Sequence, residues 1–128
     1  MTPSARTLRV AAALMLALAT IVGALGAHAL KTRLTADRYE VLQTAVHYQF
    51  FHALGLLALG VVAERENGVL LRRAGALLLL GTLLFSGSLY VLLAGAPRWL
   101  GVVTPLGGVS LIAGWLLAAL AFARPRSS

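Results

Sequence analysis

Residues 10–30 of the chain read VAAALMLALATIVGALGAHAL, a run of 21 residues without a charged side chain. Three more uncharged runs, of 23, 24 and 25 residues, follow at Val41–Ala63, Ala74–Pro97 and Trp99–Ala123. All 15 charged residues, 11 Lys and Arg and 4 Asp and Glu, lie outside these runs. An α-helix needs about 20 apolar residues to cross a hydrocarbon layer of about 30 Å. The sequence therefore predicts an all-α membrane protein.

Four spans, at about residues 10–30, 41–63, 74–96 and 103–123, fill most of the 128-residue chain. The runs are rich in Leu, Ala and Gly, and they are much longer than the about 10 residues of a barrel strand. We therefore expect a single domain over residues 1–128, a four-transmembrane-helix bundle whose first partner is the lipid bilayer.

The composition limits the classes of function. The chain is 59% hydrophobic and 12% charged, and it contains no cysteine, which excludes disulfides, thiol catalysis and Cys-ligated metal sites. A net charge of +7 would suggest nucleic acid in a soluble protein, but here the basic residues gather at the ends of the spans. There they meet anionic lipid headgroups, so we expect no nucleic-acid partner.

Basic residues are more numerous on one predicted side of the membrane. Seven belong to the side of the two termini and the second loop, and four to the other side: Arg6, Arg9, Arg65, Arg72, Arg73, Arg124 and Arg126, against Lys31, Arg33, Arg38 and Arg98. The positive-inside rule then places both termini in the cytoplasm.

The first span has features of a signal peptide. Ala27-His28-Ala29 fits an A-x-A cleavage pattern, and basic residues precede the apolar run. The run of 21 residues is, however, longer than the about 7–15 residues of a signal-peptide core. We expect an uncleaved first span.

Helix boundaries can be predicted at three places. Thr35 is a predicted N-cap for the second helix, and Asn67-Gly68 is a favoured turn pair. Thr104-Pro105 indicates an N-cap followed by Pro at the first helical position. The residues from Arg98 to Val103 would then form an interfacial or shallow re-entrant segment anchored by Trp99, with Tyr90 at the same level. A longer helix kinked at Pro105 is the alternative.

Small residues recur every four positions in the first and fourth spans: Ala19, Gly23 and Ala27, and Ser110, Gly114 and Ala118. Such stripes let helix backbones approach closely in lipid. Packing within one bundle is the favoured interpretation, and a face for a homo-oligomer or a larger membrane complex is the other.

Polar residues inside the spans are few and gather in the outer half of spans one and two. They form the candidate functional cluster: His28, Gln43, His47, Tyr48, Gln49 and His52. Polar groups in the bilayer are costly and call for a functional hypothesis. Metal binding, haem ligation and a proton relay through His52 compete with a structural role, in which these side chains hydrogen-bond neighbouring helices. The structural role is favoured.

An enzyme is not expected. Ser86-Gly87-Ser88 lies near the middle of span three, where its hydroxyls can bond back to the i−4 carbonyl or across to His52. No Asp or Glu lies within any span to orient a histidine for nucleophilic chemistry. We expect no catalytic residue, no resident metal and no cofactor.

Four ordered strings resemble a known family. They are GALGAHALK at residues 23–31, TAVHYQFFHAL at 44–54, FSGSLY at 85–90 and TPLGG at 104–108. Together they resemble the domain of unknown function 423 family of small bacterial inner-membrane proteins, which is similar to eukaryotic transmembrane protein 256. The positions that match these motifs are Gly23, Gly26, His28, Lys31, Ser86, Gly87, Ser88, Thr104, Pro105, Gly107 and Gly108.

The resemblance implies a multi-pass protein of the bacterial inner membrane and supplies no catalytic residues. With nearly all of the chain in lipid, we expect a non-enzymatic accessory, assembly or structural component of the membrane. The alternative is a small transporter or a proton-, metal- or haem-linked protein that uses the intramembrane histidines.

Overall fold

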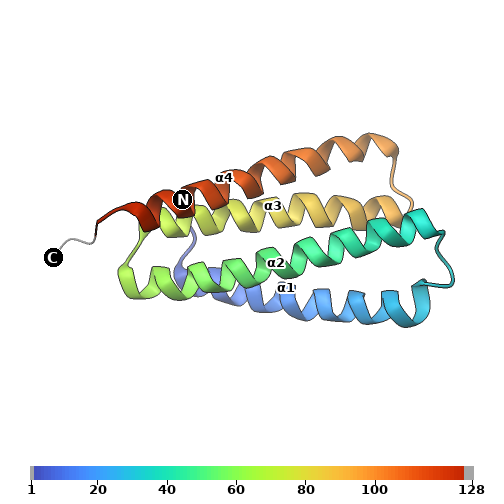
Figure 1. The fold of residues 1–128 in the computed structure, drawn as a ribbon, viewed down its shortest axis with the longest axis horizontal. Helices are drawn as coiled ribbons and strands as arrows, with labels where there is room; N and C mark the ends of the chain where they lie inside the picture. Colours follow the sequence, from blue (N-terminus) through green and yellow to red (C-terminus); the bar gives the residue numbers. More distant parts are fainter. Residues whose placement is uncertain (1, 126–128) are drawn as a thin grey trace.

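The computed structural model describes residues 2–125, and this part of the chain is built from helices without strands. The long helices are α1 (Ala5–Leu25), α2 (Ala36–Glu66), α3 (Val69–Leu93) and α4 (Val103–Ala123), with a π-helical turn η1 (Gly26–Leu30) and a 3₁₀ turn η2 (Arg98–Val102) (Figure 1). All four long helices are long and apolar enough to cross a membrane. The predicted all-α, four-span membrane fold is confirmed.

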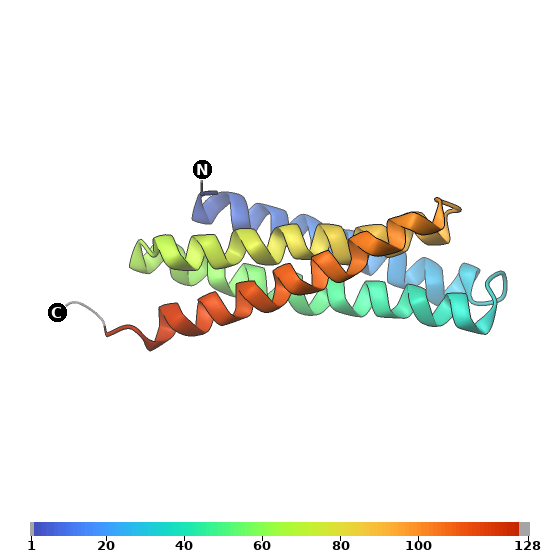
Figure 2. The same ribbon diagram turned by 90° about the horizontal axis from the view of Figure 1, so that it is seen from above.

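The four helices run antiparallel, so both ends of the described chain lie at the same end of the bundle (Figure 1). Each helix packs on the one that follows it in the chain, and α1 also touches α3. The main contact of α4 is with α3, which α4 crosses obliquely (Figure 2). The bundle is therefore open on the side where α2 and α4 flank α3.

Local sequence explains where the first three helices begin and end. The Ser4 side chain accepts a hydrogen bond from the Thr7 backbone N–H at 3.0 Å, so α1 begins several residues before the uncharged run. Thr35 caps α2 as predicted, accepting from the Arg38 N–H at 3.3 Å. Asn67, with φ of 47°, ends α2 in the left-handed conformation and starts the predicted turn to α3.

The start of α4 differs from the predicted cap. The helix begins at Val103, so Thr104 is inside it and the predicted N-cap is wrong. Pro105 is tolerated because the first-turn N–H groups have no partner within the helix. The Thr104 hydroxyl bonds Ser88 at 2.5 Å instead. The segment before α4 is a separate 3₁₀ turn, η2, in which Trp99 is 68% exposed. Its place at the membrane interface stays a prediction.

Glycines bring α3 and α4 together. A Cβ on Gly107 would overlap the backbone of Phe85 and lie 2.9 Å from the Gly81 oxygen. Further along the crossing, the Ser110 hydroxyl donates to the Leu77 carbonyl at 2.8 Å, and a Cβ on Gly114 would lie 2.9 Å from Leu78. Ser110 and Gly114 of the small-residue stripe in the fourth span thus pack against α3 of the same chain.

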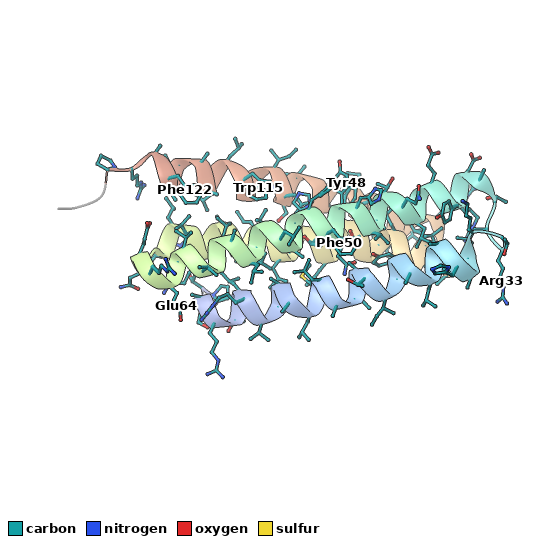
Figure 3. The ribbon with its side chains drawn as sticks, turned by 60° about the horizontal axis from the view of Figure 1, so that its bottom comes forward. Arg33, Tyr48, Phe50, Glu64, Trp115 and Phe122 are labelled. Carbon is teal, nitrogen blue, oxygen red and sulfur yellow. The ribbon has the colours of Figure 1, made fainter. Side chains whose placement is uncertain are left out.

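Arginines tie the helices at both ends of the bundle. Glu64 of α2 lies at the end where the chain begins (Figure 3). There it forms an ion pair of 2.7 Å with Arg9 of α1. At the opposite end Arg38 donates to the Leu93 carbonyl at 2.6 Å. A cation at the carboxyl end of α3 is also favoured by the helix dipole.

The crossing predicts a difference between two adjacent glycines. Gly107→Ala should destabilise the fold by about 1–3 kcal/mol because its Cβ meets the backbone of α3. Gly108→Ala should leave stability unchanged or raise it slightly, since its Cβ would lie 4.0 Å from the nearest atom, in Phe85. Unfolding in mixed detergent micelles, followed by circular dichroism, measures both. Equal stability of the two variants would contradict the close packing.

The predicted orientation can be tested because the chain has no native cysteine. In intact spheroplasts, a membrane-impermeant maleimide should label Thr32→Cys and should reach Thr2→Cys only after lysis. The reason is the excess of basic residues at the end that holds the termini; Arg126, one of that group, lies outside the described residues. The opposite labelling pattern would show that both termini lie outside the cytoplasm.

Candidate functional site

Gln49 is the centre of the polar interior. Its side chain is 3% exposed and joins three helices. The Nε2 atom donates to the Met15 carbonyl of α1 at 2.7 Å, and Oε1 accepts from the Tyr90 hydroxyl of α3 at 2.6 Å. Hydrocarbon offers no hydrogen-bond partners, so a buried amide must find them in the protein. Within residues 2–125, Gln49 is the member of the candidate cluster that hydrogen-bonds other helices.

Serines of α3 connect the other helix pairs. The Ser86 hydroxyl donates to the Ala45 carbonyl of α2 at 2.7 Å. Ser88 lies 2.9 Å from its own-helix Phe85 carbonyl and 2.5 Å from the Thr104 hydroxyl of α4. The predicted partners were the i−4 carbonyl and His52, and among the described residues neither is seen, because Ser88 bonds the i−3 carbonyl of Phe85 and the Thr104 hydroxyl instead. Ser86 bonds the backbone of α2 at Ala45 and not the side chain of His52.

Tyr48 of α2 lies on the side of the bundle where α4 carries Trp115 (Figure 3). Tyr48, His52 and Trp115 line one hollow between α2 and α4. The Tyr48 ring stacks on Phe85 with centroids 4.4 Å apart. The centroid of the His52 ring lies 5.5 Å from that of the Tyr48 ring and 6.2 Å from that of the Trp115 ring of α4. Its Nδ1 is 2.7 Å from the Tyr48 carbonyl oxygen. These rings line a hollow of about 510 Å³.

The remaining cluster residues lie elsewhere. Gln43 and His47 line a smaller hollow, of about 120 Å³, between α2 and the end of α1, and Gly23 and Gly26 are on its other wall. His28, in η1, is exposed. The structure therefore brings Tyr48 and His52 together, and Gln43 and His47, but does not gather the six residues at one site. Among residues 2–125 no group of three His, Asp or Glu side chains is placed to hold a metal.

The family-motif positions have distinct structural roles. A Cβ on Gly26 would lie 3.0 Å from Leu42, whereas one on Gly87 would meet nothing within 4 Å. Lys31 is exposed at the end of η1. Sequence reasoning treated Tyr90 as a membrane-interface anchor and overlooked its hydroxyl as a partner for Gln49. The sequence signal for this role was the position of Tyr90, a hydroxyl-bearing side chain two residues after the Ser86-Gly87-Ser88 string.

Comparison with known proteins places these motifs in one family. The family model described as "Protein of unknown function (DUF423)" matches residues 22–108, from the last turn of α1 to the first turns of α4. The chain belongs to the DUF423 family. The family resemblance of the four strings is confirmed, whereas the likeness to eukaryotic transmembrane protein 256 stays a prediction.

Relatives in this family are membrane proteins of similar length. The UPF0382 membrane protein SH2409 of Staphylococcus haemolyticus is 45% identical over 95 residues, 74% of this chain and 77% of its own. The UPF0382 inner membrane protein YgdD of Escherichia coli K12 is 44% identical over 96 residues, 75% and 73% of the two chains. No solved structure matches. Together with the four spans, these relatives make this DUF423 chain a multi-pass inner-membrane protein.

The role of Gln49 predicts a stability difference between two glutamines of α2. Gln49→Leu should destabilise the fold by about 1–2 kcal/mol, because it removes two interhelical bonds worth about 0.6 kcal/mol each on average. Gln43→Leu should change stability little, since its side chain is exposed. Detergent unfolding of both variants measures the difference. Equal stabilities would show that the Gln49 bonds contribute nothing.

Proposed function

We propose that this DUF423 protein is a non-enzymatic accessory or assembly component of the inner membrane, which packs against a further transmembrane helix. One support is the use of its polar side chains. Gln49, Ser86 and Ser88 bond neighbouring helices of the same chain, as expected of groups that build a scaffold.

The connections support contact within the bilayer. The helices are joined through residues 31–35, 67–68 and 94–97, apart from the short turns η1 and η2. Most of the described surface is consequently the lipid-facing side of the four long helices. A partner that recognises this protein would meet helix surface.

Gly87 is the observation that carries the proposal. Two other glycines of α3 are needed inside the chain, because a Cβ on Gly75 would meet Leu8 and one on Gly81 would meet Leu111. At Gly87 the same atom would meet nothing within 4 Å. Bulky residues one or two turns away are well exposed: Leu80 at 49%, Leu83 at 58% and Val91 at 45%. Gly87 thus forms a notch in an exposed ridge of α3.

This notch faces away from the rest of the bundle. Ser86 bonds α2 and Ser88 bonds α4, and successive helical residues point about 100° apart. Gly87, between them, lies on the side of α3 that neither helix covers. In lipid, where apolar contact alone gives little drive, a glycine notch lets a second backbone approach closely. The partner is a helix of a second copy or of a larger membrane complex.

A second proposal is a histidine-dependent role in transport, proton transfer, or metal or haem binding. The observation that favours it is the place of His52 on the hollow between α2 and α4. Metal analysis and visible absorption of the protein purified from native membranes test the metal and haem forms of this role.

The notch predicts the effect of a bulky substitution. Gly87→Leu should lower recovery of the partner or second copy about tenfold in mild-detergent purification after crosslinking in native membranes, a loss of about 1.4 kcal/mol. The fold should be unaffected, since the position is open and Leu favours helix.

Ala24→Leu is the matched control, because Ala24 is an exposed small residue of α1. It should leave partner recovery unchanged. The proposal fails if wild type is recovered only as a monomer without a companion, or if Gly87→Leu retains its partner as well as Ala24→Leu does.

A further inference from the structure

Two neighbouring hollows lie along the opening between α2 and α4. The hollow of about 510 Å³ beside His52 adjoins a second hollow of about 340 Å³, and Phe85 of α3 lines both. We call the two hollows together the lateral groove. Its lining comes from α2, α3 and α4 and includes Asp37, Glu40, Tyr48, His52, Phe85 and Trp115.

The groove has one polar end and one closed end. Asp37 and Glu40, in the first turns of α2, line its outer end. At the other end the Trp115 ring packs over Gly55, where an added Cβ would overlap the indole. The groove lining on α2 therefore extends from Asp37 in the first turn to His52, just past the middle of the helix.

Polar side chains follow the α2 wall down to this closed end. Glu40, Thr44, Tyr48 and His52 are spaced four residues apart, which sets them on one face of the helix. The Thr44 hydroxyl donates to the Glu40 carbonyl at 3.1 Å. Two polar groups on this wall remain, the Tyr48 hydroxyl and His52 Nε2. Both lie on the part of α2 that we place in hydrocarbon.

These two atoms have no hydrogen-bond partner among residues 2–125. A carbonyl oxygen only accepts, so His52 Nδ1 carries the hydrogen directed at the Tyr48 carbonyl. In the neutral ring, Nε2 is then an acceptor on the far side of the imidazole. The Tyr48 hydroxyl is the second group, and Tyr48 is 40% exposed. Unpaired polar atoms facing lipid are costly, so a ligand that pairs with them is favoured.

We propose that the lateral groove binds an amphiphile with a planar, hydroxyl-bearing ring on an apolar tail, of the isoprenoid quinol class. A ring hydroxyl donates to His52 Nε2, and a ring oxygen accepts from the Tyr48 hydroxyl. Aromatic side chains on two walls, the Tyr48–Phe85 stack and Trp115, offer flat surfaces for the ring. The tail leaves toward lipid past Ile112.

An acyl chain fits the groove less well, because it would leave both polar atoms unpaired. The inference goes beyond the proposed function and uses a different surface. Gly87 lies on the side of α3 opposite to Phe85 and Leu89, so a partner helix at the notch and a ligand in the groove do not compete.

Native mass spectrometry of the protein released from nanodiscs tests the proposal, with decyl-ubiquinol kept reduced as the probe. The bound fraction should saturate at one molecule per chain as the mole fraction of probe in the bilayer rises. His52→Phe keeps a ring but removes the acceptor, and it should weaken binding about tenfold. Tyr48→Phe removes only the hydroxyl and should weaken binding by a smaller factor.

Matched controls separate this site from general effects. His47→Phe, one turn away on the other hollow, should bind like wild type, and so should Gly87→Leu. Decyl-ubiquinone, which has no hydroxyl to donate, should bind wild type more weakly than the quinol does. Each variant is compared with wild type in detergent unfolding, so that a lost fold is recognised.

Three results would overturn the proposal. One is equal binding of the quinol by wild type and by a folded His52→Phe variant. Another is displacement of the quinol by an excess of hexadecane, which would assign the groove to lipid tails. The third is a helix of another protein that crosslinks to Gly108→Cys and prevents probe binding.

Discussion

The structure depends on one constraint of the bilayer: a polar group that leaves water must find its hydrogen bond within the protein. Gln49 meets this constraint by bonding α1 and α3 at once, and Ser86 and Ser88 extend the network to α2 and α4. Since apolar contact gives little net drive between helices in lipid, these bonds and close glycine contacts hold the four spans in one arrangement.

The same constraint separates structural from functional polar residues. Gln49 and Tyr90 satisfy each other inside the bundle, so their presence in the membrane is explained by the fold. Tyr48 and His52 leave one polar atom each toward the open side between α2 and α4. That side is open because α4 packs mainly on α3, drawn close by Gly107. The packing that fixes α4 therefore also creates the groove.

Several local features could be predicted because they depend on residues close in sequence. The Thr35 cap and the Asn67-Gly68 turn follow from side-chain and backbone chemistry within four residues. The Thr104 cap was predicted by the same logic and was wrong, because its hydroxyl bonds Ser88 of another helix. Local rules cannot weigh a competing partner 16 residues away.

The sequence by itself determined the number of the spans and their membrane setting, because the cost of charge in hydrocarbon acts on each segment alone. It also indicated which polar residues lie at which depth, since helical rise is constant. Only the tertiary structure decided the direction of each side chain. The orientation of α2 about its own axis places Gln49 inside the bundle and His52 on the lateral groove. Contacts of α2 with α1, α3 and α4 set this orientation.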